Sequence, residues 1–244
     1  MQTGGGFALS REVEDLIIAD AALTIGFSIA LSGGMSGVGS RAFLYLLPVS
    51  FVAVSLSFIL HELMHKFVAQ RFGSAAAFRR SDQGIIITLV TSLFGFLVGL
   101  PGATVIYSSH FTREQDAYVS LAGPLTNFLV FALFFVAGSA LFPGFSHNLL
   151  DMISTISLSG NAYLQTVFAF TVFISIYLAF FNMLPLYPLD GSKVFRWNKP
   201  VYLVVMAVIF GLLFMITGLA LIPALVFVLI LALILSSFYR MMAF

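Results

Sequence analysis

The chain has 244 residues, of which 60% are hydrophobic, 15% are aromatic and only 9% are charged, with a formal net charge of +1. Soluble domains carry about 25% charged residues, so this composition excludes a soluble fold and is typical of a protein that crosses the membrane several times. The lack of cysteine excludes a disulfide scaffold, a thiol-ligated zinc site and a cysteine nucleophile, and the small net charge excludes a basic surface for nucleic acid.

Six membrane-spanning helices are predicted, because a helix needs about 20 apolar residues to cross a bilayer. No cleavable signal peptide is expected before the first span, since residues 1–10 contain a run of glycines and are followed by acidic residues. The predicted fold class is therefore an all-α polytopic membrane protein, with residues 1–244 in a single integral membrane domain. The spans are expected at 14–32, 43–72, 117–141, 164–184, 200–220 and 222–240.

The segment 85–107 is predicted to be re-entrant, which means that it enters and leaves the membrane on the same side. Its apolar run is short, ends at Pro101-Gly102, and is rich in β-branched residues, which favours β-structure around 85–91 and 103–106. With six spans and this segment re-entrant, Arg41 lies alone on one side, and the other side is predicted to be cytoplasmic. The cytoplasmic side then carries Arg11, Arg71, Arg79, Arg80, Arg113, Lys193, Arg196, Lys199 and Arg240.

A seventh crossing by 85–107 is rejected, because it would divide these cations between the two sides of the membrane. The N- and C-termini are both predicted to be cytoplasmic. Irregular backbone at membrane depth is tolerated only where protein covers it or water reaches it, so the re-entrant segment also predicts a wet cavity on the cytoplasmic side.

The second predicted span contains His61-Glu62-Leu63-Met64-His65, which has the pattern of a zinc site. A spacing of four residues places both imidazoles on one face of a helix, where they can bind one Zn²⁺ while Glu62 lies beside the metal. Each ionisable group in an apolar span costs about 2.5 to 3.5 kcal/mol by insertion scales, so three such groups within five residues indicate a function. The alternative is a helix end whose polar side chains reach water, but His61 is expected to lie too deep for that.

A catalytic zinc ion has three protein ligands and one position for water, so a third ligand is needed. Asp190 is preferred, because two prolines and a glycine within 185–191 break the helix and allow its carboxylate to turn inward. Asp20 is the alternative at a similar depth, although it is better interpreted as a capping residue or a polar contact between helices. The other candidates are predicted near the membrane surfaces: His110, Glu114 and Asp116 on the cytoplasmic side, and His147 and Asp151 on the opposite side.

These motifs resemble those of the site-2 protease family of intramembrane zinc metalloproteases. In that family an HExxH sequence in one span and the aspartate of an N-x-x-P-x-x-x-L-D-G segment in a later span bind zinc, and both occur here, at 61–65 and 182–191. The family's glycine-proline segment is similar to Gly123-Pro124, after which Asn127 is expected to be structural, and its β-structured re-entrant loop is similar to 85–107. The resemblance covers a catalytic three-span core over 43–191 and implies a compact member without a PDZ or CBS domain.

The resemblance implies hydrolysis of peptide bonds in or near transmembrane helices of membrane-protein substrates in the lipid bilayer, with one Zn²⁺ per chain. His61, His65 and Asp190 are then the metal ligands, and Glu62 is the general base that activates water. The resemblance also implies that Asn182 positions the substrate or stabilises the oxyanion, and the alternative is that it only caps the helix end. An unwound substrate is expected to pair with a strand edge of the re-entrant segment.

The alternative function is a non-enzymatic membrane metal carrier or sensor that uses the same ligands. A carrier has no need for a base beside the metal, so the presence of Glu62 favours the protease.

Overall fold

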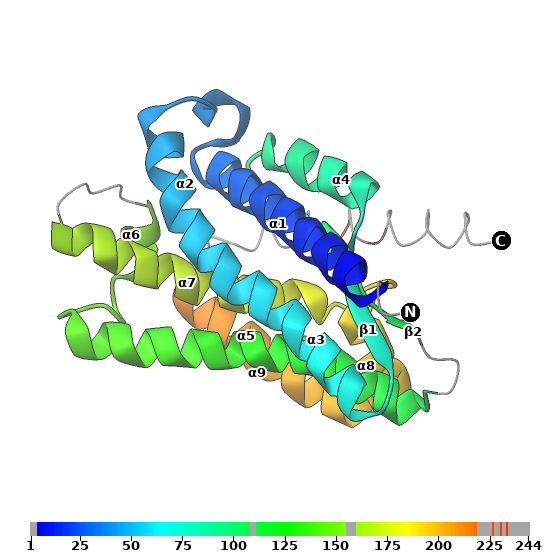
Figure 1. Ribbon diagram of the computed structural model, residues 1–244. Helices are drawn as coiled ribbons and strands as arrows, with labels where there is room; N and C mark the ends of the chain where they lie inside the picture. Colours follow the sequence, from blue (N-terminus) through cyan, green and yellow to red (C-terminus); the bar gives the residue numbers. More distant parts are fainter. Residues whose placement is uncertain are drawn as a thin grey trace.

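The computed structural model describes residues 4–107, 111–154 and 160–218, and the single positions 226, 230 and 233. In this part of the chain, long helices pack side by side and a two-stranded sheet lies at one end of the bundle (Figure 1). In chain order the elements are α1 (Gly4–Leu31), the 3₁₀ turn η1 (Gly34–Gly37), α2 (Arg41–Val54), the π-helical turn η2 (Ser55–Ile59), α3 (Leu60–Arg71), β1 (Ala75–Arg80), α4 (Asp82–Ser92), β2 (Gly102–Tyr107), α5 (Arg113–Leu141), α6 (Leu149–Ser154), α7 (Gly160–Asn182), α8 (Asp190–Trp197) and α9 (Lys199–Thr217).

Four helices of the described chain are long and apolar enough to cross a membrane, judged by length and composition. They are the continuous helix Arg41–Arg71, formed by α2, η2 and α3, and the helices α5, α7 and α9, and they match the spans predicted at 43–72, 117–141, 164–184 and 200–220. α1 covers the predicted span 14–32 but falls short of this standard, because every stretch of 18 residues in it contains Glu14, Asp15 and Asp20. Of the predicted span 222–240 only three isolated positions are described, so six spans remain a prediction.

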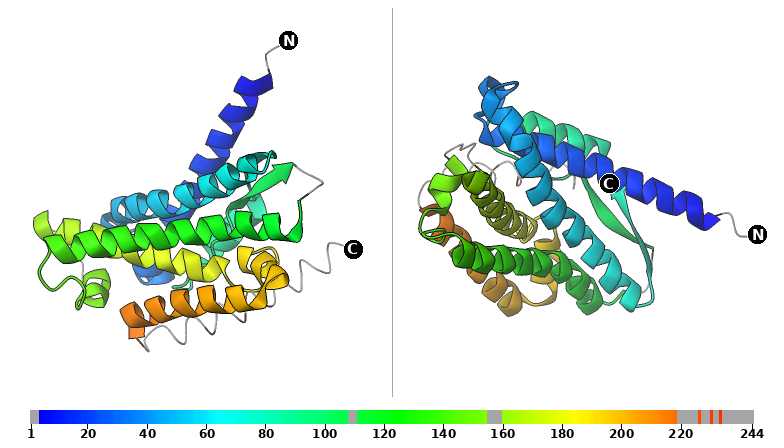
Figure 2. Two further views of the ribbon diagram at one scale, coloured as in Figure 1. Left: turned by 90° about the horizontal axis from the view of Figure 1, so that it is seen from below. Right: turned by 60° about the vertical axis from the view of Figure 1, so that its left-hand side comes forward.

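α7 lies at the centre of the bundle, where it packs against α5, α2 and α9 (Figure 2). Every residue from Ala169 to Phe181 is buried, so this part of α7 is covered by protein on all its faces. The few polar side chains in α7 find partners within the bundle. Thr171 donates to the Val167 carbonyl at 2.8 Å, and the Ser175 hydroxyl lies 2.7 Å from the Ser57 hydroxyl of η2.

The segment 85–107 agrees with its prediction only in part. Residues 103–106 lie in β2 as expected, and β2 pairs antiparallel with β1 so that Thr104 is opposite Phe78. The predicted β-structure at 85–91 is wrong, because these residues lie in α4, whose N-cap Ser81 accepts a hydrogen bond from the Gly84 amide. β-Branched residues disfavour a helix only weakly, and here the capping residue and the packing of α4 on α1 decide the conformation.

The path from β1 through α4 to β2 starts and ends at the same end of the bundle. α4 runs toward the loop between α1 and α2, to which its C-terminal end is hydrogen-bonded, and residues 96–101 return toward the sheet without helical or strand structure. Side chains hold this return segment, since Thr88 donates to the Val98 carbonyl at 3.0 Å and the Tyr177 hydroxyl of α7 donates to the Leu97 carbonyl at 2.6 Å. Its backbone is therefore paired with protein, as a re-entrant segment requires.

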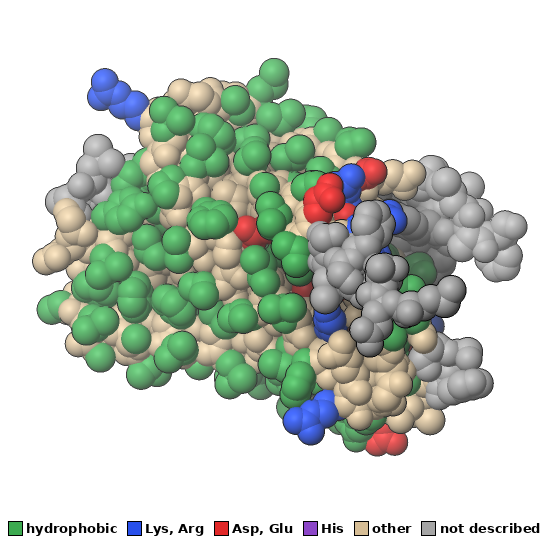
Figure 3. Space-filling model, viewed as in Figure 1, with side chains coloured by type: hydrophobic (Ala, Val, Ile, Leu, Met, Phe, Trp, Pro, Cys, Tyr) green, Lys and Arg blue, Asp and Glu red, His purple; other side chains and the backbone are tan. Residues whose placement is uncertain are grey.

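Charged side chains gather at the end of the molecule that carries the sheet, while hydrophobic side chains cover most of the rest of the visible face (Figure 3). Aromatic rings lie among these charges. The ring centre of Tyr118 lies 5.2 Å from that of Trp197 and 6.4 Å from that of Phe72. Such a mixture is typical of the level of the lipid head groups. The elements that meet at this end carry Arg71, Arg79, Arg80, Arg113, Lys193, Arg196 and Lys199.

Candidate metal centre

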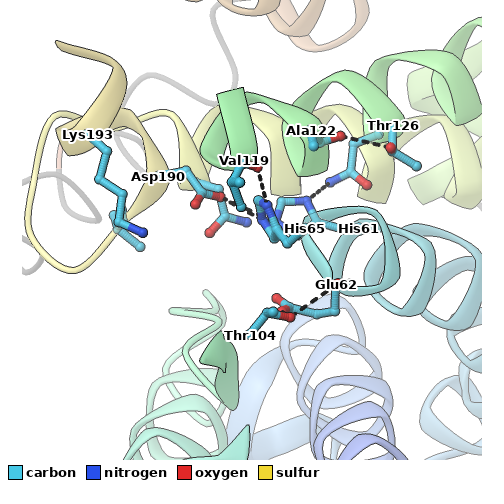
Figure 4. Close-up of polar contacts among 12 residues, drawn as sticks. His61, Glu62, His65, Thr104, Val119, Ala122, Thr126, Asp190 and Lys193 are labelled. Carbon is cyan, nitrogen blue, oxygen red and sulfur yellow. Dashed lines mark hydrogen bonds and ion pairs between the residues drawn. The ribbon is translucent and has the colours of Figure 1, made fainter. Parts of the chain in front are cut away.

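Ligand atoms of His61, His65 and Asp190 meet at one point between α3 and α8 (Figure 4). Nε2 of His61 lies 2.9 Å from Nε2 of His65, and Asp190 Oδ2 lies 3.4 Å and 3.1 Å from these two nitrogens. Around a tetrahedral Zn²⁺ with bonds of about 2.0 to 2.1 Å, ligand atoms lie about 3.3 Å apart. The three side chains therefore fit a zinc ion, and two imidazoles with one carboxylate form a donor set that zinc prefers.

Both histidines lie in α3, which directly follows the π-helical turn η2. A π-helical turn inside an α-helix is rare and frequently occurs at functional sites. Phe58 of this turn packs edge-on against Phe78 of β1, with 5.6 Å between the ring centres, and Ser57 contacts α7. The start of α3 is thus held between the central helix and the sheet.

Asp190 is the first residue of the short helix α8, and it follows the break that was predicted after the fourth span. α7 ends at Asn182, and residues 183–189 form an irregular turn, as their prolines predicted. The turn closes tightly at Gly191, where a Cβ atom would collide with the Met183 carbonyl oxygen. This close approach, which only glycine permits, places the neighbouring Asp190 against α3.

The environment of Asp190 favours its ionised form. Burial raises the pKa of the Asp190 carboxyl, but in the metal-free site, where His65 is protonated, its charge and the hydrogen bonds from both imidazoles outweigh burial and hold that pKa below its ordinary value. Asp190 is therefore a carboxylate at neutral pH, which is the form that binds a metal.

Both histidines are oriented by groups of α5. His65 Nδ1 lies 2.6 Å from the Val119 carbonyl oxygen, so it carries the proton and leaves Nε2 free for a metal. His61 Nδ1 lies 3.2 Å from the side-chain amide of fully buried Asn127, whose Oδ1 has no partner in the described part of the chain. With the amide turned by 180°, Oδ1 accepts from His61 Nδ1–H, and Nε2 of His61 is likewise free for a metal.

α5 approaches the histidines most closely at Gly123. A Cβ atom at this position would lie 2.5 Å from Cε1 and Nε2 of His61 and from Nε2 of His65. Glycine therefore allows α5 to cover the site, and the backbone of α5 forms one of its walls.

Glu62 lies beside the ligands and faces β2, where the Thr104 hydroxyl donates to its Oε2 at 2.9 Å (Figure 4). Glu62 and the three ligands line one cavity of about 110 Å³. Residues 99–104 form a wall of this cavity, and Asn182 and Lys193 also line it.

The structure places the other predicted candidates away from the ligand group. Asp20 accepts a hydrogen bond from Ser55 at 2.9 Å, which is the contact between helices that the sequence suggested. Asp116 pairs with Lys193 at 3.2 Å, and Glu114 accepts from Tyr118 at 2.7 Å. The remaining candidates are His147, in the loop before α6, Asp151, in α6, and His110, which lies outside the described residues.

The position of Asn182 agrees with both of its predicted roles. It lines the cavity, and its Nδ2 donates to the Leu178 carbonyl at 3.0 Å, which is a contact at the helix end. Its role toward a substrate stays a prediction.

Sequence analysis did not identify Thr104 or Lys193 as residues of the site. A threonine within a β-branched run and a lysine in a polar turn carry no catalytic pattern of their own. Only the fold brings them to the cavity.

Comparison with known proteins places these residues in a family context. The profile described as Peptidase family M50 matches residues 49–216. A protein of Methanocaldococcus jannaschii named "Putative zinc metalloprotease" is 34% identical over 196 residues, which cover 80% of this chain and 88% of the relative. A Bacillus subtilis protein of the same description is 30% identical over 163 residues, covering 62% of this chain and 69% of the relative. No solved structure matches the chain significantly.

Proposed function

Because the chain belongs to peptidase family M50, the site-2 protease family, and is thus a zinc metalloprotease, we propose that it hydrolyses peptide bonds in or near transmembrane helices of membrane proteins. The observation that carries this proposal is the meeting of the His61, His65 and Asp190 ligand atoms within 4.8 Å of one another, with Glu62 beside them. This arrangement combines a three-ligand metal site with an adjacent carboxylate, as hydrolysis by activated water requires.

His61, His65 and Asp190 are the proposed ligands of one Zn²⁺ per chain. Zn²⁺ bound there supplies a Lewis acid that polarises a peptide carbonyl and promotes the ionisation of water. The carboxylates of Asp190 and Glu62 balance the charge of the ion, so the site buries no net charge.

Glu62 is the proposed general base. Thr104 holds Oε2, so Oε1 accepts the proton of the attacking water and returns it to the nitrogen of the leaving amine. Asn182 lines the same cavity and, once it releases the Leu178 carbonyl, donates to the substrate carbonyl oxygen as that oxygen gains negative charge.

The substrate is a transmembrane segment that unwinds before it is cut. A cavity of about 110 Å³ cannot admit a helix, which is about 10 Å across with its side chains. An unwound segment would pair with the edge of β2 that has no partner strand among the described residues, and β2 leads into the cavity at Gly102 and Thr104. Proline substitutions along β2 should then reduce cleavage without loss of zinc.

The active site is proposed to lie within the membrane, toward the cytoplasmic side. This assignment is supported by the cations and aromatic rings that surround the sheet, since Lys and Arg are concentrated on the cytoplasmic side of membrane proteins. It implies that the N-terminus is cytoplasmic, because the N-terminal half of α1 contacts the sheet, and that 85–107 is a re-entrant segment. A cytoplasmic C-terminus remains part of the proposal.

The experiment uses the full-length protein in lipid vesicles with single-span reporter proteins. One reporter carries Gly-Pro near the cytoplasmic end of its transmembrane helix, and a matched reporter carries Leu-Leu there. The wild type is expected to cut the first reporter faster than the second, because Gly-Pro unwinds a helix.

The variants separate the ligands from the base. Glu62→Gln is expected to retain about one zinc per chain and to lose about 10²- to 10⁴-fold in rate, whereas Asp190→Ala loses zinc and cleavage together. Undiminished cleavage by Glu62→Gln would refute the base, and equal zinc in Asp190→Ala would refute the ligand set. Zinc binding without cleavage of any reporter would favour a metal carrier.

A further inference from the structure

The sheet contacts the proposed base through one side chain. The Thr104 hydroxyl lies 2.9 Å from Glu62 Oε2 and 3.1 Å from the Glu62 carbonyl oxygen. Both acceptors belong to Glu62, so the Thr104 hydroxyl donates its proton to Glu62 whichever of the two oxygens accepts it. β2 therefore holds one carboxylate oxygen of Glu62, a residue that lines the cavity (Figure 4).

β1, the strand that pairs with β2, is hydrogen-bonded to α1. Phe78 of β1 lies opposite Thr104, and its amide N–H donates to Glu12 Oε1 of α1 at 3.2 Å. The Phe78 side chain is 1% exposed and packs against Phe58, just before α3. β1 is thus held by the hydrogen bond from its Phe78 amide to Glu12 and by the packing of the Phe78 ring on Phe58.

The same Glu12 carboxylate forms an ion pair with Lys66 of α3. Lys66 Nζ donates to both of its oxygens, at 2.8 Å and 2.7 Å, and Lys66 lies one helical turn after Glu62. Glu12 is only 5% exposed, so this ion pair is largely shielded from water. Removal of one partner would leave a buried charge unpaired, which is strongly unfavourable.

These contacts form a closed ring that begins and ends on α3. It runs from Glu62 to Thr104, across the sheet to Phe78, then to Glu12, and through Lys66 back to α3. We propose that Thr104 is a positioning residue for Glu62, and that the Glu12–Lys66 ion pair holds the sheet at the distance this contact needs. The inference deepens the proposed function, on which its catalytic part rests.

The catalytic part is tested with Thr104→Val, which keeps the shape and removes the donor, and with Thr104→Ser, which keeps the donor. A loosely held base loses productive geometry, and misplacement by about 1 Å costs about 10²-fold in rate. We expect Thr104→Val to lower kcat on the Gly-Pro reporter about 10- to 100-fold, with KM and zinc content unchanged, and Thr104→Ser to restore most of the rate. Wild-type kcat in Thr104→Val, or equal loss in both variants, would refute the positioning role.

The structural part is tested by hydrogen exchange, which needs no substrate. In zinc-free full-length protein, Glu12→Gln should accelerate exchange of the amides of 75–80 and 102–107 about tenfold or more. The matched control is Asp82→Asn, which removes a charge from the ion pair of Arg80 and Asp82 at the same sheet, where Asp82 is 80% exposed. An exposed pair contributes little, so this control should exchange like the wild type.

The outcomes distinguish the two proposals. Equal exchange in Glu12→Gln and Asp82→Asn refutes the ion pair as the anchor of the sheet. Accelerated exchange together with a wild type that cuts neither reporter refutes the proposed function and, with it, the positioning of a base. Accelerated exchange in Glu12→Gln together with the expected loss of kcat in Thr104→Val supports both parts of the proposal.

Discussion

Gly123 provides a direct test of how α5 shapes the proposed metal centre. In Gly123→Ala the new methyl group would lie 2.5 Å from atoms of both imidazoles, whereas ordinary van der Waals contact begins at 3.4 Å. The histidines cannot move away freely, because Val119 and Asn127 hold their other ring nitrogens. One partner must therefore shift by about 0.9 Å, and a metal site tolerates deviations of only about 0.2 Å in its bond lengths.

We expect Gly123→Ala to weaken zinc binding by about 100-fold or more, since loss of supporting contacts alone costs about 10- to 100-fold. The assay is competition with a chelator of known affinity, followed by metal analysis of the purified protein. Gly211→Ala in α9 is the matched control, because the same substitution there meets no atom within 4 Å. Thermal unfolding of the zinc-free variants separates a local clash from a general loss of structure. Wild-type zinc affinity in Gly123→Ala would refute the assigned packing of α5 on α3.

Three further substitutions test the surroundings of the site. Asn127→Leu should lower zinc affinity about 10- to 100-fold in the same competition assay, because His61 loses the group that orients its ring; an unchanged affinity would assign Asn127 to packing alone. Gly191→Ala should force open the turn that holds Asp190 and so reduce the zinc content measured by elemental analysis, and a full zinc complement would contradict this account of the turn. Tyr177→Phe should lower the free energy of unfolding by about 1 to 3 kcal/mol in a denaturant titration while one zinc per chain is retained, since the buried Leu97 carbonyl loses its donor; equal stability would mean that another donor replaces the hydroxyl.

The sequence by itself determined which residues could form the proposed metal site. A spacing of four residues places His61 and His65 on one face wherever a helix forms, because helical geometry is a local property of the backbone. The prolines and glycine around Asp190 likewise predict a break in the chain from local geometry alone, and the break is present between α7 and α8. Long apolar runs predicted four helices that the structure contains, because the cost of burying polar backbone in lipid leaves few alternatives.

Only the tertiary structure decided which distant residues meet. Composition favoured β-structure at 85–91, but a cap at Ser81 and packing on α1 make this segment a helix, since β-propensity depends on context. Sequence left Asp20 and Asp190 as rival ligands, and the turn at Gly191 places Asp190 beside the histidines while Asp20 contacts Ser55. Contacts between Thr104 and Glu62 join residues 42 positions apart, and no local pattern encodes such a distance, because it depends on how whole elements pack.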